Sequence, residues 1–191
     1  MKKKGSIMLI IIMAIVGAYL IYNHFNNKGT INNSDKNFNE EYSLVDKDNV
    51  YKYINIDELL NILNKDGIVL IGFKENIWTN YYAKYLNEIA KDNNIKEIMF
   101  YDVRKDRQSN NIKYTKLINS LSEYLPTNDE CMPYISVPYL LIIKDSKIIH
   151  TDNETALLNT NITPKNYWNN ENINSFKDKI NNYIIDYKGG E

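Results

Sequence analysis

The side chains best able to do covalent or metal chemistry are few in this sequence of 191 residues. It contains one cysteine, Cys131, and two histidines, His24 and His150. A single cysteine cannot form an intramolecular disulfide, and zinc or iron–sulfur sites need several cysteine or histidine ligands. We therefore expect no metal, no cofactor and no disulfide within the chain.

The single thiol is a weak candidate for a nucleophile. Cys131 lies in residues 129–133, with the sequence DECMP. Acidic neighbours disfavour the thiolate anion, which is the form that attacks a disulfide. We interpret Cys131 as an unpaired cysteine without a catalytic role. The alternative is an intermolecular disulfide with a partner, because the outside of a cell is often oxidising.

Composition and motifs exclude several other functions. The formal net charge is -1, so there is no basic surface to favour a nucleic-acid partner. The charged run at residues 104–107, RKDR, lacks the glycines that let a backbone approach an anion. No catalytic triad, P-loop or dinucleotide fingerprint can be drawn. The motifs therefore indicate no enzyme class.

Hydrophobic periodicity predicts one α/β domain in residues 50–191. Apolar runs at 68–73, 97–103 and 137–143 predict strands, and residues 147–151 predict a strand paired with the last of these through a hairpin turn. Apolar stripes at helical spacing predict helices at 57–65, at 82–92, at 112–125 before Pro126, and at 172–187. This order predicts a mixed sheet with helices on both faces.

One connection is long for so small a domain. Residues 151–170 link the predicted hairpin to the last helix, and long loops are often functional. The adjacent aromatic residues Tyr167 and Trp168 either fasten the last helix or anchor a partner. Both interpretations stay open at this point.

Two stretches resemble the thioredoxin fold. Residues 136–145, SVPYLLIIKD, are similar to the segment in which a cis-proline opens a strand that leads into a hairpin. The resemblance therefore implies a cis bond between Val137 and Pro138. Residues 69–72 and 86–90 resemble the strand and the long helix on either side of the active-site turn. The nearest family is the thioredoxin-like bacteriocin transport accessory proteins, which carry a Cys-x-x-Cys turn and often an amino-terminal membrane segment.

The cysteines of that turn are missing. Counted from either flanking stretch, the turn falls on residues 76–79, NIWT; aligning Phe73 with the phenylalanine of the thioredoxin strand moves the pair to Trp78 and Tyr81. Neither register contains a cysteine, and dithiol exchange needs two thiols. The acid that many thioredoxins bury ahead of the first cysteine falls on Leu70. We therefore expect a redox-inactive protein.

The resemblance also implies a peptide-binding surface that does not depend on sulfur. In the family, the residue before the cis-proline pairs its backbone with an extended substrate peptide, which points to Val137 and Pro138. Asn76, Trp78 and Thr79 would lie at a helix start, where free N–H groups favour carbonyl or carboxylate partners. The alternative is structural: Thr79 caps the helix and Trp78 covers the core.

The amino-terminal segment has the pattern of a membrane anchor. Three lysines lie in residues 1–6, and residues 7–22 are uncharged. As a helix this run reaches about 24 Å, and interfacial Tyr19 and Tyr22 extend the crossing. We interpret residues 7–22 as an uncleaved signal anchor with the amino terminus in the cytoplasm, and residues 23–49 as a flexible linker. The alternatives are a signal peptide cleaved near residues 16–18 and a buried core helix.

These patterns together predict a single-pass protein of the cell membrane with an extracytoplasmic thioredoxin-like domain. Its anchor contacts membrane lipid, and its domain binds a peptide or protein or assists export, without redox activity. The alternative is a single-cysteine, thiol-dependent oxidoreductase that uses Cys131 together with the cysteine of a partner.

Overall fold

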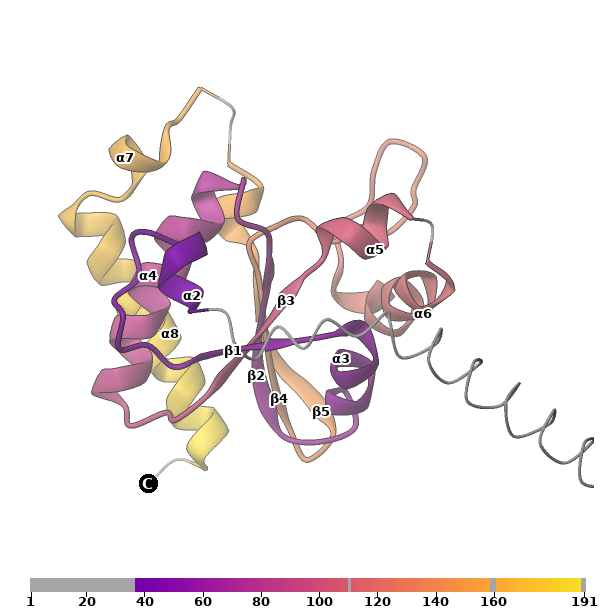
Figure 1. Cartoon of the computed structure of the whole chain (residues 1–191), viewed down its shortest axis with the longest axis horizontal. Helices are drawn as coiled ribbons and strands as arrows, with labels where there is room; N and C mark the ends of the chain where they lie inside the picture. Colours follow the sequence, from indigo (N-terminus) through magenta and orange to yellow (C-terminus); the bar gives the residue numbers. More distant parts are fainter. Residues whose placement is uncertain (1–36, 110, 159–160, 190–191) are drawn as a thin grey trace, which may run out of the picture. The chain divides into compact units, whose positions relative to one another are not determined.

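A mixed sheet of five strands organises the chain (Figure 1). The computed structural model describes residues 37–109, 111–158 and 161–189. The strands lie in the order β1-β3-β2-β4-β5, in which β1, β3 and β2 are parallel and β4 is antiparallel to both neighbours. Their bounds are β1 Tyr51–Ile54, β2 Gly67–Gly72, β3 Ile98–Asp102, β4 Tyr139–Lys144 and β5 Lys147–Asp152.

Helices cover both faces of this sheet, as predicted (Figure 1). Helices α4 and α8 pack on one face, and α3 and α6 pack on the other. The longer helices are α3 Ile56–Ile62, α4 Ile77–Asp92, α6 Ile112–Leu121 and α8 Asn170–Lys188. The short elements are α2 Phe38–Glu41, α5 Arg104–Gln108, η2 Ser122–Tyr124, η3 Glu154–Ala156 and α7 Pro164–Tyr167.

The central strands need cover on two sides because they are apolar at nearly every position. All residues of β2 are buried. Ile68 and Leu70 belong to the core under α4 and α8, whereas Val69 and Ile71 belong to the core under α3 and α6. Successive side chains of a strand point to opposite faces, so a continuous apolar run favours a buried central strand. Leu70, where the resemblance left no acid, is fully buried.

Asparagine residues begin the longer helices. Asn55, Asn76, Asn111 and Asn169 precede α3, α4, α6 and α8, and each side chain accepts a hydrogen bond from a backbone N–H of the first turn. Such a cap stabilises a helix by about 1 kcal/mol. At the other end, α8 stops at Gly189, whose φ of 102° is left-handed and suits glycine. The asparagine-rich composition thus has a structural use.

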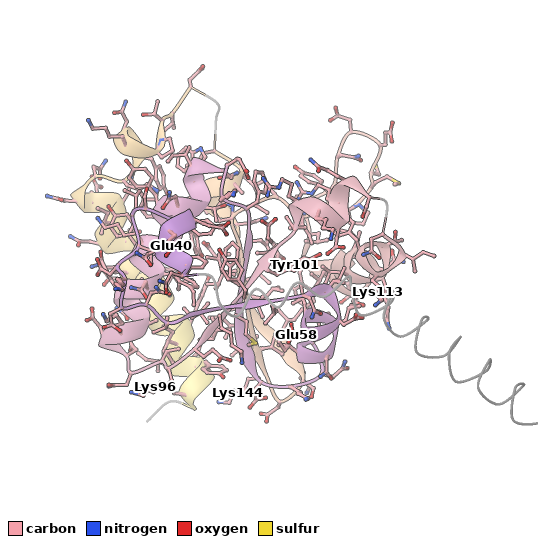
Figure 2. All side chains as sticks on the ribbon, in the orientation of Figure 1. Glu40, Glu58, Lys96, Tyr101, Lys113 and Lys144 are labelled. Carbon is pink, nitrogen blue, oxygen red and sulfur yellow. The ribbon has the colours of Figure 1, made fainter. Side chains whose placement is uncertain are left out.

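The ends of α3 and α6 meet at the surface. Figure 2 places Glu58 of α3 and Lys113 of α6 on the same side of the sheet. The Nζ atom of Lys113 lies 2.6 Å from Oδ2 of Asp57, and both side chains are largely exposed. An exposed pair of this kind contributes about 0–1 kcal/mol, so burial of the apolar faces, not this contact, holds the two helices.

The prediction of a flexible linker at residues 23–49 is wrong for its last part. Phe38, Tyr42 and Val45 are buried in the same core as α4. The ring of Phe38 stacks on Tyr42 at 4.3 Å and on Tyr51 at 4.2 Å. Aromatic rings bury large areas, and this burial outweighs the polar composition around them. The domain therefore begins before residue 50, and the predicted anchor at residues 7–22 lies outside the described residues.

Buried amides of α4 explain how this polar segment is held. Asn80 accepts a hydrogen bond from the N–H of Leu44 at 3.2 Å, and Asn87 accepts one from the N–H of Val50 at 3.1 Å. Both asparagine side chains are buried. Their carbonyl oxygens satisfy backbone donors that would otherwise lose water without a partner.

The other predicted elements differ at their ends. Strand β1 was not predicted, and neither was α5, which contains the charged run at 104–107. The helix predicted at 112–125 stops at Leu121 and continues as the 3-10 turn η2. The strand predicted at 137–143 begins at Tyr139, so Val137 and Pro138 lie outside it. The bond between Val137 and Pro138 is cis, as predicted.

Candidate functional site

The start of α4 lies against the segment before Pro138. Asn76 is the N-cap of α4, and its Oδ1 accepts a hydrogen bond from the N–H of Thr79 at 2.9 Å. The Nδ2 of the same side chain donates to the carbonyl oxygen of Val137 at 3.3 Å. The structure thus brings together Asn76 and Val137, two of the residues that the resemblance pointed to. We call residues 135–138 the pre-proline segment.

Thr79 is placed differently from the expectation. It is fully buried, and its hydroxyl has no hydrogen-bond partner among the described residues. Its side chain packs against the backbone of Gly72, at the end of β2. The helix cap is Asn76 and not Thr79. Thr79 therefore joins the helix to the sheet and does not reach a ligand.

Trp78 is half-buried and joins the site to the long connection after β5. Its ring meets that of Tyr167 edge to face, with 5.6 Å between centroids. The next residue, Trp168, is buried and contacts the rings of Tyr85 and Phe176. The two open interpretations of the aromatic pair therefore separate: Trp168 fastens α8 to α4, whereas Tyr167 lies beside the site.

Hydrogen bonds with distant parts of the chain fix the pre-proline segment. Arg107 in α5 donates from Nη2 to the carbonyl oxygen of Ile135 at 2.7 Å. The hydroxyl of Ser136 donates to the carbonyl oxygen of Ala156 at 3.3 Å. Sequence reasoning missed these contacts. The charged run that contains Arg107 was the only available signal, and it did not indicate a partner.

The site offers backbone donors, among them the N–H of Val137, and exposed apolar side chains. No described residue accepts a hydrogen bond from the N–H of Val137. Ile77, the first residue of α4, is 51% exposed, and so is Leu157, which follows Ala156 in the turn held by Ser136. Ile77 adjoins Asn76, and Leu157 adjoins Ala156, in the chain, so each follows a residue that is hydrogen-bonded to the pre-proline segment. Backbone donors and apolar side chains are suited to an extended peptide, which supplies carbonyl oxygens and apolar groups.

A carboxyl group with a raised pKa lies at the end of the neighbouring strand. Asp102 pairs in register with Gly72, which leads into α4. Burial raises the pKa of Asp102, while a hydrogen bond from the backbone N–H of Arg104 and the Arg104 charge act in the opposite direction. Arg104 also forms an ion pair with Glu75. An acidic residue at the end of an apolar strand was the signal in the sequence, but no thiol lies among residues 76–79 for it to serve.

Cys131 lies at the tip of a tight turn. The side-chain oxygen of Asn128 accepts the N–H groups of Glu130 at 3.0 Å and of Met132 at 2.9 Å. The φ of Cys131 is 58°, and its thiol is exposed. An exposed thiol is accessible to another molecule, but a second thiol to resolve a mixed disulfide does not exist in the sequence.

A cluster of polar side chains reaches from the core to the surface at the end of β5. The carboxylate of Asp152 accepts the hydroxyl of Tyr82 at 2.8 Å and the ammonium of Lys179 at 2.6 Å. Lys179 also contacts Glu154 at 2.7 Å, and Glu154 accepts a long hydrogen bond from Tyr167. Together these contacts tie α8 to the end of β5, so the cluster is a structural element that supports Tyr167.

Metal ligands are not clustered in the part of the chain that the structure describes. No helix within residues 37–109, 111–158 and 161–189 is long and apolar enough to cross a membrane. Comparison with models of protein families, with curated proteins and with solved structures found no match, so the site rests on its own geometry.

Proposed function

We propose that this chain is a thioredoxin-like protein without a dithiol site, which binds an extended peptide or protein segment outside the membrane to which its amino terminus anchors it. The strand order β1-β3-β2-β4-β5 supports the fold, together with a long helix directly after β2 and Pro138 directly before β4. The lysines before the apolar run at residues 7–22 support the anchor and the orientation.

One observation carries the binding proposal. The N–H of Val137 has no partner among the described residues, although Val137 is only 9% exposed. A backbone donor without a partner inside the protein is left to water or to a ligand, and a peptide carbonyl oxygen would satisfy it. Ile77 and Leu157 supply apolar surface for side chains on the same peptide.

The chemistry of residues 76–79 favours binding over catalysis. Thioredoxin chemistry needs an attacking thiolate at a helix start and a second thiol. Here the helix start is occupied by Asn76, which uses its side chain as a cap. The position can therefore hold a peptide, and it has no group to cleave or reduce one.

Hydrogen exchange tests this proposal. The full chain, purified in detergent, is mixed with carboxymethylated lactalbumin, a permanently unfolded protein that presents many extended segments. We expect exchange at the Val137 amide to slow when the unfolded protein binds, because a carbonyl oxygen then pairs with that N–H. Binding without protection at Val137 would place the interaction elsewhere and contradict the proposal.

A pair of variants supplies the matched control. Ile77→Ser should weaken binding about tenfold, because a large part of one apolar side chain is no longer buried by the ligand. Ile185→Ser removes a side chain of similar exposure, 47%, from α8 and should leave the affinity unchanged. Equal effects of the two substitutions would show that the site near Asn76 is not the binding surface.

The second candidate is a thiol-dependent oxidoreductase that acts through Cys131 and the cysteine of a partner. The exposure of this thiol on a turn is the observation that favours it. In that case the Cys131 thiolate would attack a disulfide, form a mixed disulfide and release one thiolate. The thiolate of the partner would then attack the Cys131 sulfur, release the second thiolate and leave a disulfide between Cys131 and the partner. Reduction of insulin disulfides by the wild type and by Cys131→Ala separates the two candidates.

A further inference from the structure

The side chain of Asn76 performs two tasks at once. Its Oδ1 accepts the N–H of Thr79 at 2.9 Å, and its Nδ2 donates to the carbonyl oxygen of Val137 at 3.3 Å. An asparagine carboxamide carries an acceptor and a donor on one carbon, so it can cap a helix and bind a carbonyl oxygen together. Serine, aspartate and threonine also cap helices, so capping α4 does not by itself require a side chain that also donates to Val137.

The second contact changes what the pre-proline segment can offer. A segment that pairs with an extended peptide normally presents both an N–H and a C=O from one residue. At Val137 the N–H has no partner among the described residues, whereas the C=O is already occupied by Asn76. The N–H of Val137 is thus open to a ligand, whereas its carbonyl oxygen already accepts one hydrogen bond within the protein.

From this geometry we infer that Asn76 is an intramolecular competitor of the peptide. Its carboxamide donates to the Val137 carbonyl oxygen, so it competes there with a peptide N–H for the same acceptor. The contact weakens peptide binding and selects ligands that gain enough elsewhere to displace the side chain. This inference rests on the proposed peptide-binding function and adds to it a residue that sets affinity.

The test replaces Asn76 by residues that keep the cap and lose the donor to Val137. Asn76→Ser keeps an oxygen for the N–H of Thr79, but its side chain is shorter. Asn76→Asp has the same shape, is a strong cap and cannot donate at neutral pH, so it stays informative if the serine variant folds poorly. The full chain in detergent is titrated with labelled carboxymethylated lactalbumin, and the dissociation constant is measured by fluorescence anisotropy.

We expect both variants to bind about three- to tenfold more tightly than the wild type, which is the effect of one net hydrogen bond no longer given up on binding. The matched control is Asn55→Ser at the start of α3, where the side chain accepts the N–H groups of Asp57 and Glu58. This variant also loses a carboxamide from a helix cap, but far from Val137, and it should leave the affinity unchanged.

The outcomes separate this inference from the proposed function. Wild-type binding with protection at Val137, and an unchanged or weaker affinity in both Asn76 variants, overturns the competitor role and leaves the binding function in place. No binding by the wild type or by either variant overturns the binding function and the competitor role with it. Binding by the variants alone supports both.

Discussion

The backbone of Gly72 touches the side chain of Thr79. A Cβ atom at position 72 would lie 2.4 Å from Cγ2 and 2.9 Å from Oγ1 of Thr79. This close approach lets the end of β2 and the first turn of α4 pack directly on each other. It therefore fixes where the helix begins relative to the sheet, and with it the position of Asn76.

Gly72→Ala should destabilise the protein by about 1–3 kcal/mol, because the new methyl group overlaps a buried branched side chain that cannot rotate away. Denaturation in urea measures the loss. Gly67→Ala is the control: the nearest atom to its Cβ is the terminal methyl of Met99, which is flexible. We expect a loss below about 1 kcal/mol there, and Thr79→Ala should recover part of the loss at Gly72. Equal losses at the two glycines would contradict the packing described.

Lys179→Met should destabilise the protein by about 3 kcal/mol, as measured by urea denaturation. The change leaves the carboxylate of Asp152, whose side chain is 6% exposed, without its cation. This loss of unfolding free energy is at the lower end of the range for breaking a buried ion pair, because the side chain of Lys179 is 28% exposed. Lys177→Met on the same helix breaks a more open pair with Glu88 and should cost under about 1 kcal/mol. Similar costs would show that Asp152 is better solvated than its burial indicates.

The pH dependence of the Glu154 contact has a defined sign. A hydrogen bond from Lys179, opposed by burial and assisted by the charge of Lys179, lowers the pKa of Glu154 below its ordinary 4.5. The folded state therefore binds the proton less tightly than the unfolded state. The stabilisation is present above the ordinary pKa and is lost as the pH falls through the folded value.

A carbon-13 NMR titration of the Glu154 carboxyl measures this directly. In Lys179→Met the pKa of Glu154 should rise, because the hydrogen bond and the charge of Lys179 are gone, while burial and the weaker hydrogen bond from Tyr167 remain. In Lys177→Met the titration of Glu154 should match that of the wild type. A titration of Glu154 that does not respond to Lys179 would rule out the pairing.

Wild-type protein and Cys131→Ala should both fail to reduce insulin disulfides or glutathione disulfide, because no second thiol exists to resolve the mixed disulfide. Since Cys131 is exposed, its removal leaves no cavity, and the thermal midpoints of the two proteins should agree within a few degrees. Turnover by the wild type that disappears in the variant would replace the binding function with the single-thiol enzyme.

Protease added to intact, wall-stripped cells should digest the domain, because the lysines in residues 1–6 favour a cytoplasmic amino terminus and an external carboxyl-terminal part. A cytoplasmic marker protein should survive the same treatment. Protection of the domain in intact cells, followed by digestion after lysis, would reverse the proposed orientation.

Strongly periodic elements could be predicted from the sequence, and short ones could not. Strand β2 and helix α4 are marked by a long apolar run and a regular stripe, so their existence was clear. Strand β1 has four residues and contains Lys52, and α2 has four residues in an asparagine-rich stretch. Such elements depend on contacts made by the rest of the fold, and local sequence carries little of that information.

The same limit applies to the candidate site. Asn76 and Val137 could be assigned to one surface because of the resemblance, but the hydrogen bond between them was not predicted. Arg107 and Ile135 are also joined, but they come from a helix and a loop that no local pattern connects. The burial of Thr79 was likewise hidden, since threonine is common both at exposed helix starts and in contact with a sheet.

The asparagine caps have a consequence for how the chain folds. Each of these hydrogen bonds joins residues two or three positions apart, so it closes a very small loop and can form early. The sheet is different, because β1 must find β3 and β2 must find β4 across the helices between them. We therefore expect the helix starts to form before the strands meet, and the ordering of the strands to set the folding rate.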